Sequence, residues 1–64
     1  MTLQELLIKT NHVFIDLCDE DYEQIDLFHT DKITPNSALI RKNQEVLEIG
    51  TSGNQTIFIR IKGR

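Results

Sequence analysis

The chain has 64 residues, a formal net charge of −3 and a single cysteine, Cys18. A domain of this length buries only about 60% of its unfolded surface, so its core is marginal and leaves little room for an enclosed catalytic cleft. One cysteine excludes an internal disulfide and fits a reducing compartment. No signal-peptide pattern and no apolar run near the ~20 residues of a membrane span is present. We therefore expect one cytoplasmic domain over residues 1–64, without membrane association.

The first predicted element is a short helix over residues 2–10. Thr2 and Glu5 have the spacing of a capping box, in which each side chain bonds the other residue's backbone amide. Leu3, Leu6 and Leu7 then fall on one helical stripe. A helix this short is not stable alone, so its leucines must dock on another element.

Two alternating segments follow, at 12–18 and 24–29, and an acidic turn separates them. Alternation of apolar and polar residues is typical of strands, so we predict a β-hairpin. Matching the apolar sets pairs Leu17 with Ile25 and Ile15 with Leu27 on one face. This register places Phe14 opposite Phe28, and Asp16 opposite Asp26, on the other face.

Residues 30–43 allow two interpretations. Thr34 followed by Pro35 is typical of a helix start, with proline in the first turn, and Asn43 can close such a helix. The alternative is a Pro-Asn turn leading into a strand over residues 38–41. We favour one to three turns of helix.

The closing segment predicts a second hairpin, with strands at 46–50 and 55–61. A Ser52-Gly53-Asn54 loop pairs Ile49 with Ile57 and Leu47 with Ile59, which gives one continuous apolar face. Asn54 is the expected left-handed residue of that loop.

Together these elements predict an α+β fold, in the order helix, strand, strand, helix, strand, strand. The two hairpins form a small four-stranded antiparallel sheet, and the leucines of the helices cover one face. The opposite face is expected to carry Phe14, Phe28, Phe58, Asp16, Asp26, Glu48 and Arg60. Three phenylalanines on a solvated face exceed ordinary exposure and indicate an interface.

No motif for catalysis or for a cofactor is present. The Asp16 and Asp26 carboxylates lack a cleft. The acidic run over residues 19–21 lacks the mid-loop glycine of a calcium loop, and its flanks are predicted strands, not helices. Residues of the types that bind zinc are present, but their spacing matches no ligand pattern: His12, Cys18, His29 and Asp31. Acidic neighbours disfavour the thiolate of Cys18. We expect no enzyme activity, no metal and no cofactor.

Charge is divided unevenly along the chain. Residues 1–32 carry most of the acids, and residues 33–64 carry most of the bases, at Arg41, Lys42, Arg60, Lys62 and Arg64. A nucleic-acid-binding role for these bases is one alternative, but the pI near 5.1 argues against it. The acidic hairpin is either a solvated tip or a surface complementary to a basic protein.

Three segments carry a resemblance to known proteins. They are the opening Thr2-Leu3-Gln4-Glu5-Leu6-Leu7, the later Gln44-Glu45-Val46-Leu47-Glu48-Ile49 and the closing Ile57-Phe58-Ile59-Arg60-Ile61. In this layout the chain resembles small accessory proteins of phages and other mobile elements of low-GC Gram-positive bacteria. Some of these inhibit host or defence enzymes, anti-CRISPR proteins among them. The resemblance implies a binding protein and assigns no residue a role.

We therefore predict a non-enzymatic protein-binding module, an inhibitor of a host or defence protein being one form of it. The partner would have a basic surface. The alternatives are a self-associating homodimer, joined by an exposed strand or by the phenylalanine-bearing face, and a nucleic-acid-binding protein. The predicted contact residues lie in the first hairpin: Phe14, Asp16, Asp19, Glu20, Asp21, Glu23, Asp26 and Phe28.

Overall fold

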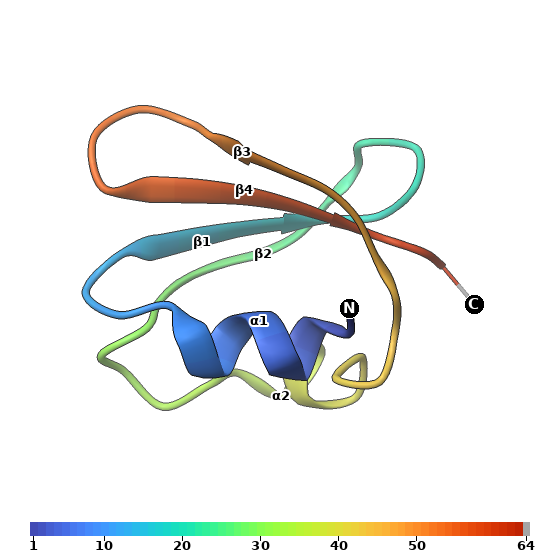
Figure 1. The fold of residues 1–64 in the computed structure, drawn as a ribbon, viewed down its shortest axis with the longest axis horizontal. Helices are drawn as coiled ribbons and strands as arrows, with labels where there is room; N and C mark the ends of the chain where they lie inside the picture. The colour runs from blue at the N-terminus through green and yellow to red at the C-terminus, as the bar shows by residue number, and fades with distance from the viewer. Residues whose placement is uncertain (64) are drawn as a thin grey trace.

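The computed structural model describes residues 1–63, which form an α+β fold with one mixed sheet (Figure 1). In chain order the elements are α1 (Leu3–Lys9), β1 (Phe14–Cys18), β2 (Gln24–His29), α2 (Asn36–Leu39), β3 (Val46–Thr51) and β4 (Thr56–Ile61). This order confirms the predicted α+β class and the predicted sequence of elements. Both helices lie on the same side of the sheet. Neither of the helices in residues 1–63 is long and apolar enough to cross a membrane.

Helix α1 begins at the predicted capping box. The amide of Glu5 donates to Thr2 Oγ1 over 3.3 Å, and the amide of Thr2 donates to Glu5 Oε1 over 2.9 Å. Leu3 and Leu6 are buried against the sheet. Local chemistry therefore determines where the helix starts, and burial of its leucines holds it in place.

The sheet has the strand order β2-β1-β4-β3, and its central strands β1 and β4 are parallel. The expectation of a purely antiparallel sheet was therefore wrong. Each hairpin is antiparallel, as predicted, but the hairpins join through their more apolar strands. This arrangement buries Ile15 and Leu17 of β1 beside Ile59 and Ile61 of β4, in the middle of the sheet. Alternation within a strand carries no information about the direction of its non-local neighbour.

The first hairpin is shifted by one residue from the predicted register. Ile15 pairs with Phe28 and Leu17 with Asp26, and the pairing becomes irregular between Leu17 and Cys18. A shift of one residue exchanges the two faces of a strand. Phe28 therefore lies in the core, and Leu27 takes the exposed position opposite Asp16.

The second hairpin is shifted by two residues, so from Glu48 onward its faces are as predicted although its partners are not. The pairing is irregular between Val46 and Glu48, so Val46 pairs with Ile61 and packs against the core, and its predicted place on the opposite face was wrong. Ile49 pairs with Ile59, and Thr51 pairs with Ile57. The loop is longer than expected, and its left-handed residues are Gly53 and Gln55, with φ of 88° and 54°. The predicted left-handed Asn54 was therefore wrong.

Helix α2 is a single turn, which decides between the two interpretations of residues 30–43. It begins one residue later than predicted, because Pro35 is the N-cap and makes no side-chain capping bond. The short helix turns Ala38 into the core and leaves Leu39 half exposed, so Leu39 contributes less to the cover than expected. Asn43 does not adopt the left-handed conformation predicted for a helix end.

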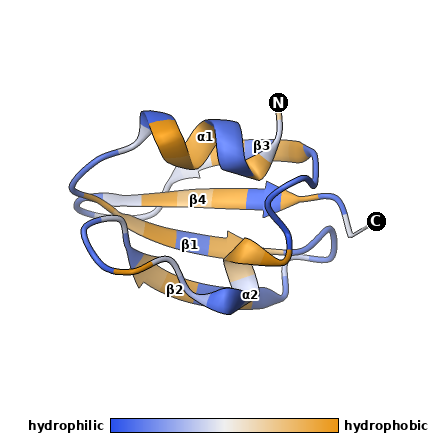
Figure 2. Cartoon of the chain, turned by 90° about the horizontal axis from the view of Figure 1, so that it is seen from below, coloured by the Kyte–Doolittle hydropathy of each residue, from blue (hydrophilic) through white to orange (hydrophobic). Residues whose placement is uncertain are grey.

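The core lies between the helices and the sheet. Viewed from the helical side, α1 runs beside β4 and β3, and α2 lies across β1 and β2 (Figure 2). The buried hydrophobic cluster has members from both helices and from three strands: Leu3, Leu6, Ile15, Leu17, Phe28, Ala38, Ile59 and Ile61. The opposite side of the sheet faces away from this cluster, and we call it the open face.

Candidate binding surface on the open face of the sheet

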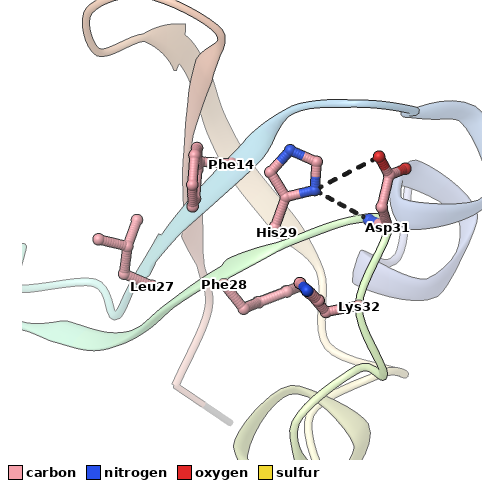
Figure 3. Close-up of a pocket in the computed structure, with 6 residues that line it drawn as sticks. All are labelled: Phe14, Leu27, Phe28, His29, Asp31 and Lys32. Atoms are coloured by element: carbon pink, nitrogen blue, oxygen red, sulfur yellow. Dashed lines mark hydrogen bonds and ion pairs between the residues drawn. The ribbon is translucent and has the colours of Figure 1, made fainter.

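The open face carries apolar side chains at the end where β1 begins. Phe14 is 44% exposed and Leu27 is 53% exposed, although both come from strands. The rings of Phe14 and His29 meet edge to face, with centroids 4.7 Å apart. With Leu27 and Asp31 they line a depression that continues past the β2 edge to Phe28 on the helical side and to Lys32 in the loop after β2 (Figure 3). This end of the face offers exposed apolar contact area held by cross-strand packing.

A charged and aromatic cluster occupies the other end, formed by Tyr22, Glu48, Phe58 and Arg60. The Tyr22 ring stacks on Phe58, with centroids 6.1 Å apart, and the Arg60 guanidinium lies 4.9 Å from the centroid of Tyr22. Glu48 Oε1 accepts hydrogen bonds from Arg60 Nε and from the Tyr22 hydroxyl, each over 3.0 Å. Both bonds lower the pKa of the Glu48 carboxyl, and the bond from Arg60 contributes more than the bond from Tyr22. The same ion pair raises the pKa of Arg60.

The acidic turn between β1 and β2 is a structured loop. Asp19 Oδ1 accepts from the amides of Asp21 and Glu23 over 2.9 and 3.0 Å. Tyr22 has a left-handed φ of 66°, which turns the chain so that its ring reaches Phe58. Glu20 Oε1 accepts from the amide of Gly63 over 2.8 Å. Asp19 and Glu20 therefore have structural roles, and Asp21 and Glu23 are exposed acids.

The structure separates the eight predicted contact residues into two groups. Phe14 and Asp16 lie on the open face, and Asp19, Glu20, Asp21 and Glu23 form the turn at its end. Phe28 and Asp26 lie on the helical side instead. Phe28 packs into the core, and Asp26 Oδ2 accepts a 2.5 Å hydrogen bond from the Ser37 hydroxyl. Their predicted place on the open face was wrong, because the strand register differs by one residue.

Sequence reasoning missed Tyr22 and Leu27 as open-face residues. Leu27 was assigned to the core by the same register error. Tyr22 gave no pattern signal, because its position depends on a left-handed backbone conformation that a bulky residue rarely adopts.

Three of the four residues considered for zinc lie together near the start of β1. His12 Nδ1 lies 3.0 Å from Asp31 Oδ2, and this contact is the main cause of the lowered pKa of the Asp31 carboxyl. The amide of Asp31 donates to His29 Nδ1 over 3.1 Å, which occupies the ring nitrogen nearest the carboxylate. Among residues 1–63 no group of three or more metal-ligating side chains has an arrangement that could hold an ion.

Cys18 is buried at the far end of β1, away from the histidines. Burial raises the pKa of its thiol, and the carboxylates of Asp16 and Asp19 raise it further. A protonated, buried thiol is a poor nucleophile and a poor metal ligand.

The basic residues considered for nucleic-acid binding are partly engaged within the fold. Arg60 is held by Glu48, and Arg41 donates to the carbonyl of Ser37 over 2.7 Å. Lys62 follows β4, and Arg64 lies outside the described residues.

Comparisons with family models, with curated proteins and with solved structures gave no match to this chain. The open face and its charges are therefore the features from which a function is proposed.

Proposed function

We propose that this chain is a non-enzymatic protein-binding module that uses the open face together with the acidic turn. The observation that carries the proposal is the exposure of Phe14, Leu27 and Tyr22 on one side of the sheet. Tyr22 is 61% exposed although it stacks on Phe58. Large aromatic side chains already fixed by neighbours lose little entropy on binding, which makes them effective anchors.

The charge of the acidic turn supports a partner with a basic surface. Asp21 and Glu23 are exposed at the end of the open face where Tyr22 lies. Complementary charge speeds the encounter of two proteins, and apolar contacts then slow their dissociation. The same geometry supports inhibition of a host or defence enzyme whose own ligand is acidic.

The arrangement of the carboxylates supports a binding role over catalysis. Asp16 lies on the open face, and Asp26 bonds Ser37 on the helical side, so the two acids do not share a site. Three of the six side chains that line the depression beside β2 are apolar, at Phe14, Leu27 and Phe28. We place this activity in the cytoplasm, where a single reduced cysteine is the ordinary state.

The test is affinity capture from the host with the intact chain, followed by binding measurements on the purified partner. Phe14→Ala with Leu27→Ala removes open-face contacts, and Leu39→Ala with Ile40→Ala is the matched control on the helical side. We expect the open-face pair to weaken binding about tenfold or more, since hot-spot truncations cost over about 1.4 kcal/mol. The control pair should leave affinity within about twofold.

Charge is tested separately, by Asp21→Asn with Glu23→Gln. Association should slow at low salt and should be unchanged at high salt, because screening removes long-range attraction. Circular dichroism confirms that each variant is folded. The proposed surface is wrong if the partner binds the Phe14→Ala, Leu27→Ala variant as tightly as the original chain but binds the Leu39→Ala, Ile40→Ala variant more weakly.

A further inference from the structure

The two edges of the sheet differ in how their backbone groups are satisfied. On the β2 edge the amide of Leu27 donates to Asp26 Oδ1 over 2.8 Å, and Asp26 is itself held by Ser37. Helix α2 also contacts this strand. Covering an edge with a side chain and a helix prevents other strands from pairing with it. The β2 edge is therefore closed to strand addition at this point.

The β3 edge lacks this protection toward its Thr51 end, whereas at its start the amide of Val46 donates to the carbonyl of Met1 over 2.8 Å. The amide of Ser52 donates to the carbonyl of Thr56 on β4. Backbone groups alternate in direction along a strand, so those of Gly50 also face β4 and those of Ile49 and Thr51 point away from the sheet. Within residues 1–63 neither outward amide meets a side-chain or loop acceptor.

The side chains of β3 also lack the usual defences against edge pairing. The strand has the sequence Val-Leu-Glu-Ile-Gly-Thr, with no lysine and no proline. Its one charge, Glu48, is neutralised by Arg60 on the open face. Ile49 remains 48% exposed on the helical side, next to the outward amides. An edge whose single acid is already paired, and whose other side chains carry no charge, favours pairing with another strand.

We propose that β3 pairs antiparallel with β3 of a second copy, about a two-fold axis at Gly50. Ile49 of each copy then exchanges hydrogen bonds with Thr51 of the other, so the outward groups of both residues are satisfied. Gly50 meets Gly50 at the axis without any side chain, and Glu48 lies opposite Ser52 instead of another acid. The strand is therefore compatible with itself, as a symmetric interface requires.

The pairing extends the sheet of each copy into one continuous sheet. Residues directly opposite in an antiparallel pair lie on the same face, so both open faces lie on one side of the dimer. The interface is small and the association is accordingly weak, with a concentration-dependent equilibrium between monomer and dimer. This inference does not depend on the proposed function, although two open faces on one side would bind a repetitive partner more strongly.

The experiment is sedimentation velocity on the full chain from micromolar to millimolar concentration, with two variants of Ile49. Ile49→Pro removes an outward amide and no β3–β4 hydrogen bond, and Ile49→Lys places a charge at the edge. Both should raise the dimer dissociation constant about tenfold or more. Ile49→Pro removes one outward amide from each copy and so two hydrogen bonds from the dimer, whereas Ile49→Lys keeps the amides and brings charges together at the interface. Leu27→Lys, on the open face and the other edge strand, should dimerise like the original chain.

Amide exchange measured by NMR gives a second readout that needs no variant. The amides of Ile49 and Thr51 should exchange more slowly as concentration rises, and the amide of Leu27 should not change. A chain that stays monomeric at millimolar concentration overturns the proposal. So does a dimer that persists in both Ile49 variants, or one that is lost in Leu27→Lys and kept in Ile49→Pro.

Discussion

Among single residues, Glu48 connects three parts of the open face. It accepts from Arg60 and from Tyr22, and so links the edge strand β3 to β4 and to the acidic turn. Arg60 in turn donates to the carbonyl of Glu20 over 3.3 Å. This network holds the Tyr22 ring on Phe58, so the aromatic part of the proposed binding surface is ordered before any partner arrives.

The lowered pKa of Glu48 predicts a contribution to stability that depends on pH. A carboxyl whose pKa is lower in the folded chain stabilises the fold above its unfolded pKa, near the ordinary value of 4.5. That stability is lost as the pH falls through the folded pKa. The melting temperature of Glu48→Gln should therefore fall less on acidification than that of the original chain.

Thermal unfolding followed by circular dichroism between neutral and acidic pH measures this difference. Glu45→Gln is the matched control, because the exposed Glu45 side chain makes no hydrogen bond to another side chain within residues 1–63. Its curve should run parallel to that of the original chain. Parallel curves for Glu48→Gln as well would contradict the assigned role of the ion pair.

At the level of the elements, the turns determine which side chains reach the open face. The first turn depends on Asp19, whose carboxylate binds the amides of Asp21 and Glu23, and on the left-handed Tyr22. This turn sets the register in which Phe28 is buried and Leu27 is exposed. A turn with another length would exchange the two faces of β2.

Replacing Asp19 by Ala should destabilise the chain by about 1 kcal/mol, because two backbone amides lose their acceptor. Asp19→Asn keeps an acceptor oxygen at the same place and changes only the charge, so it should cost less than Asp19→Ala. Urea unfolding of both variants measures the difference. Equal loss in the two variants would indicate that charge, and not the turn, is what Asp19 contributes.

The elements also show which parts of the fold follow from local sequence. The capping box of α1, the presence of both hairpins and the element order were predicted, because each depends on residues close together in the chain. The registers and the parallel contact of β1 with β4 were not, because they depend on left-handed turn residues and on distant packing. Of the candidate site, Phe14 and the acidic turn were predicted, but the position of Tyr22 was not.

For the molecule as a whole, a single small core must hold every element. Ile59 lies at its centre, fully buried on the central strand β4. A chain of this length has a net stability of only a few kcal/mol. Each buried side chain therefore accounts for a large share of that stability.

Ile59→Ala should cost about 2–5 kcal/mol, which is enough to leave much of the chain unfolded at room temperature. Ile33→Ala makes the same chemical change at a side chain that is 95% exposed, and should stay within about 0.5 kcal/mol of the original. Denaturant unfolding monitored by circular dichroism compares the two variants. Similar losses at both positions would contradict the placement of the core.

The parallel pairing of β1 with β4 has a consequence for the order of folding. Phe14 pairs with Thr56, so the centre of the sheet joins residues from opposite ends of the chain. During synthesis β1 is the first strand to be made, and its neighbour β4 follows only after β2, α2 and β3. Contacts between distant residues slow folding, because a long loop must close before any burial compensates for it. The centre of the sheet therefore forms only after β4 has been made, has left the ribosome and has reached β1.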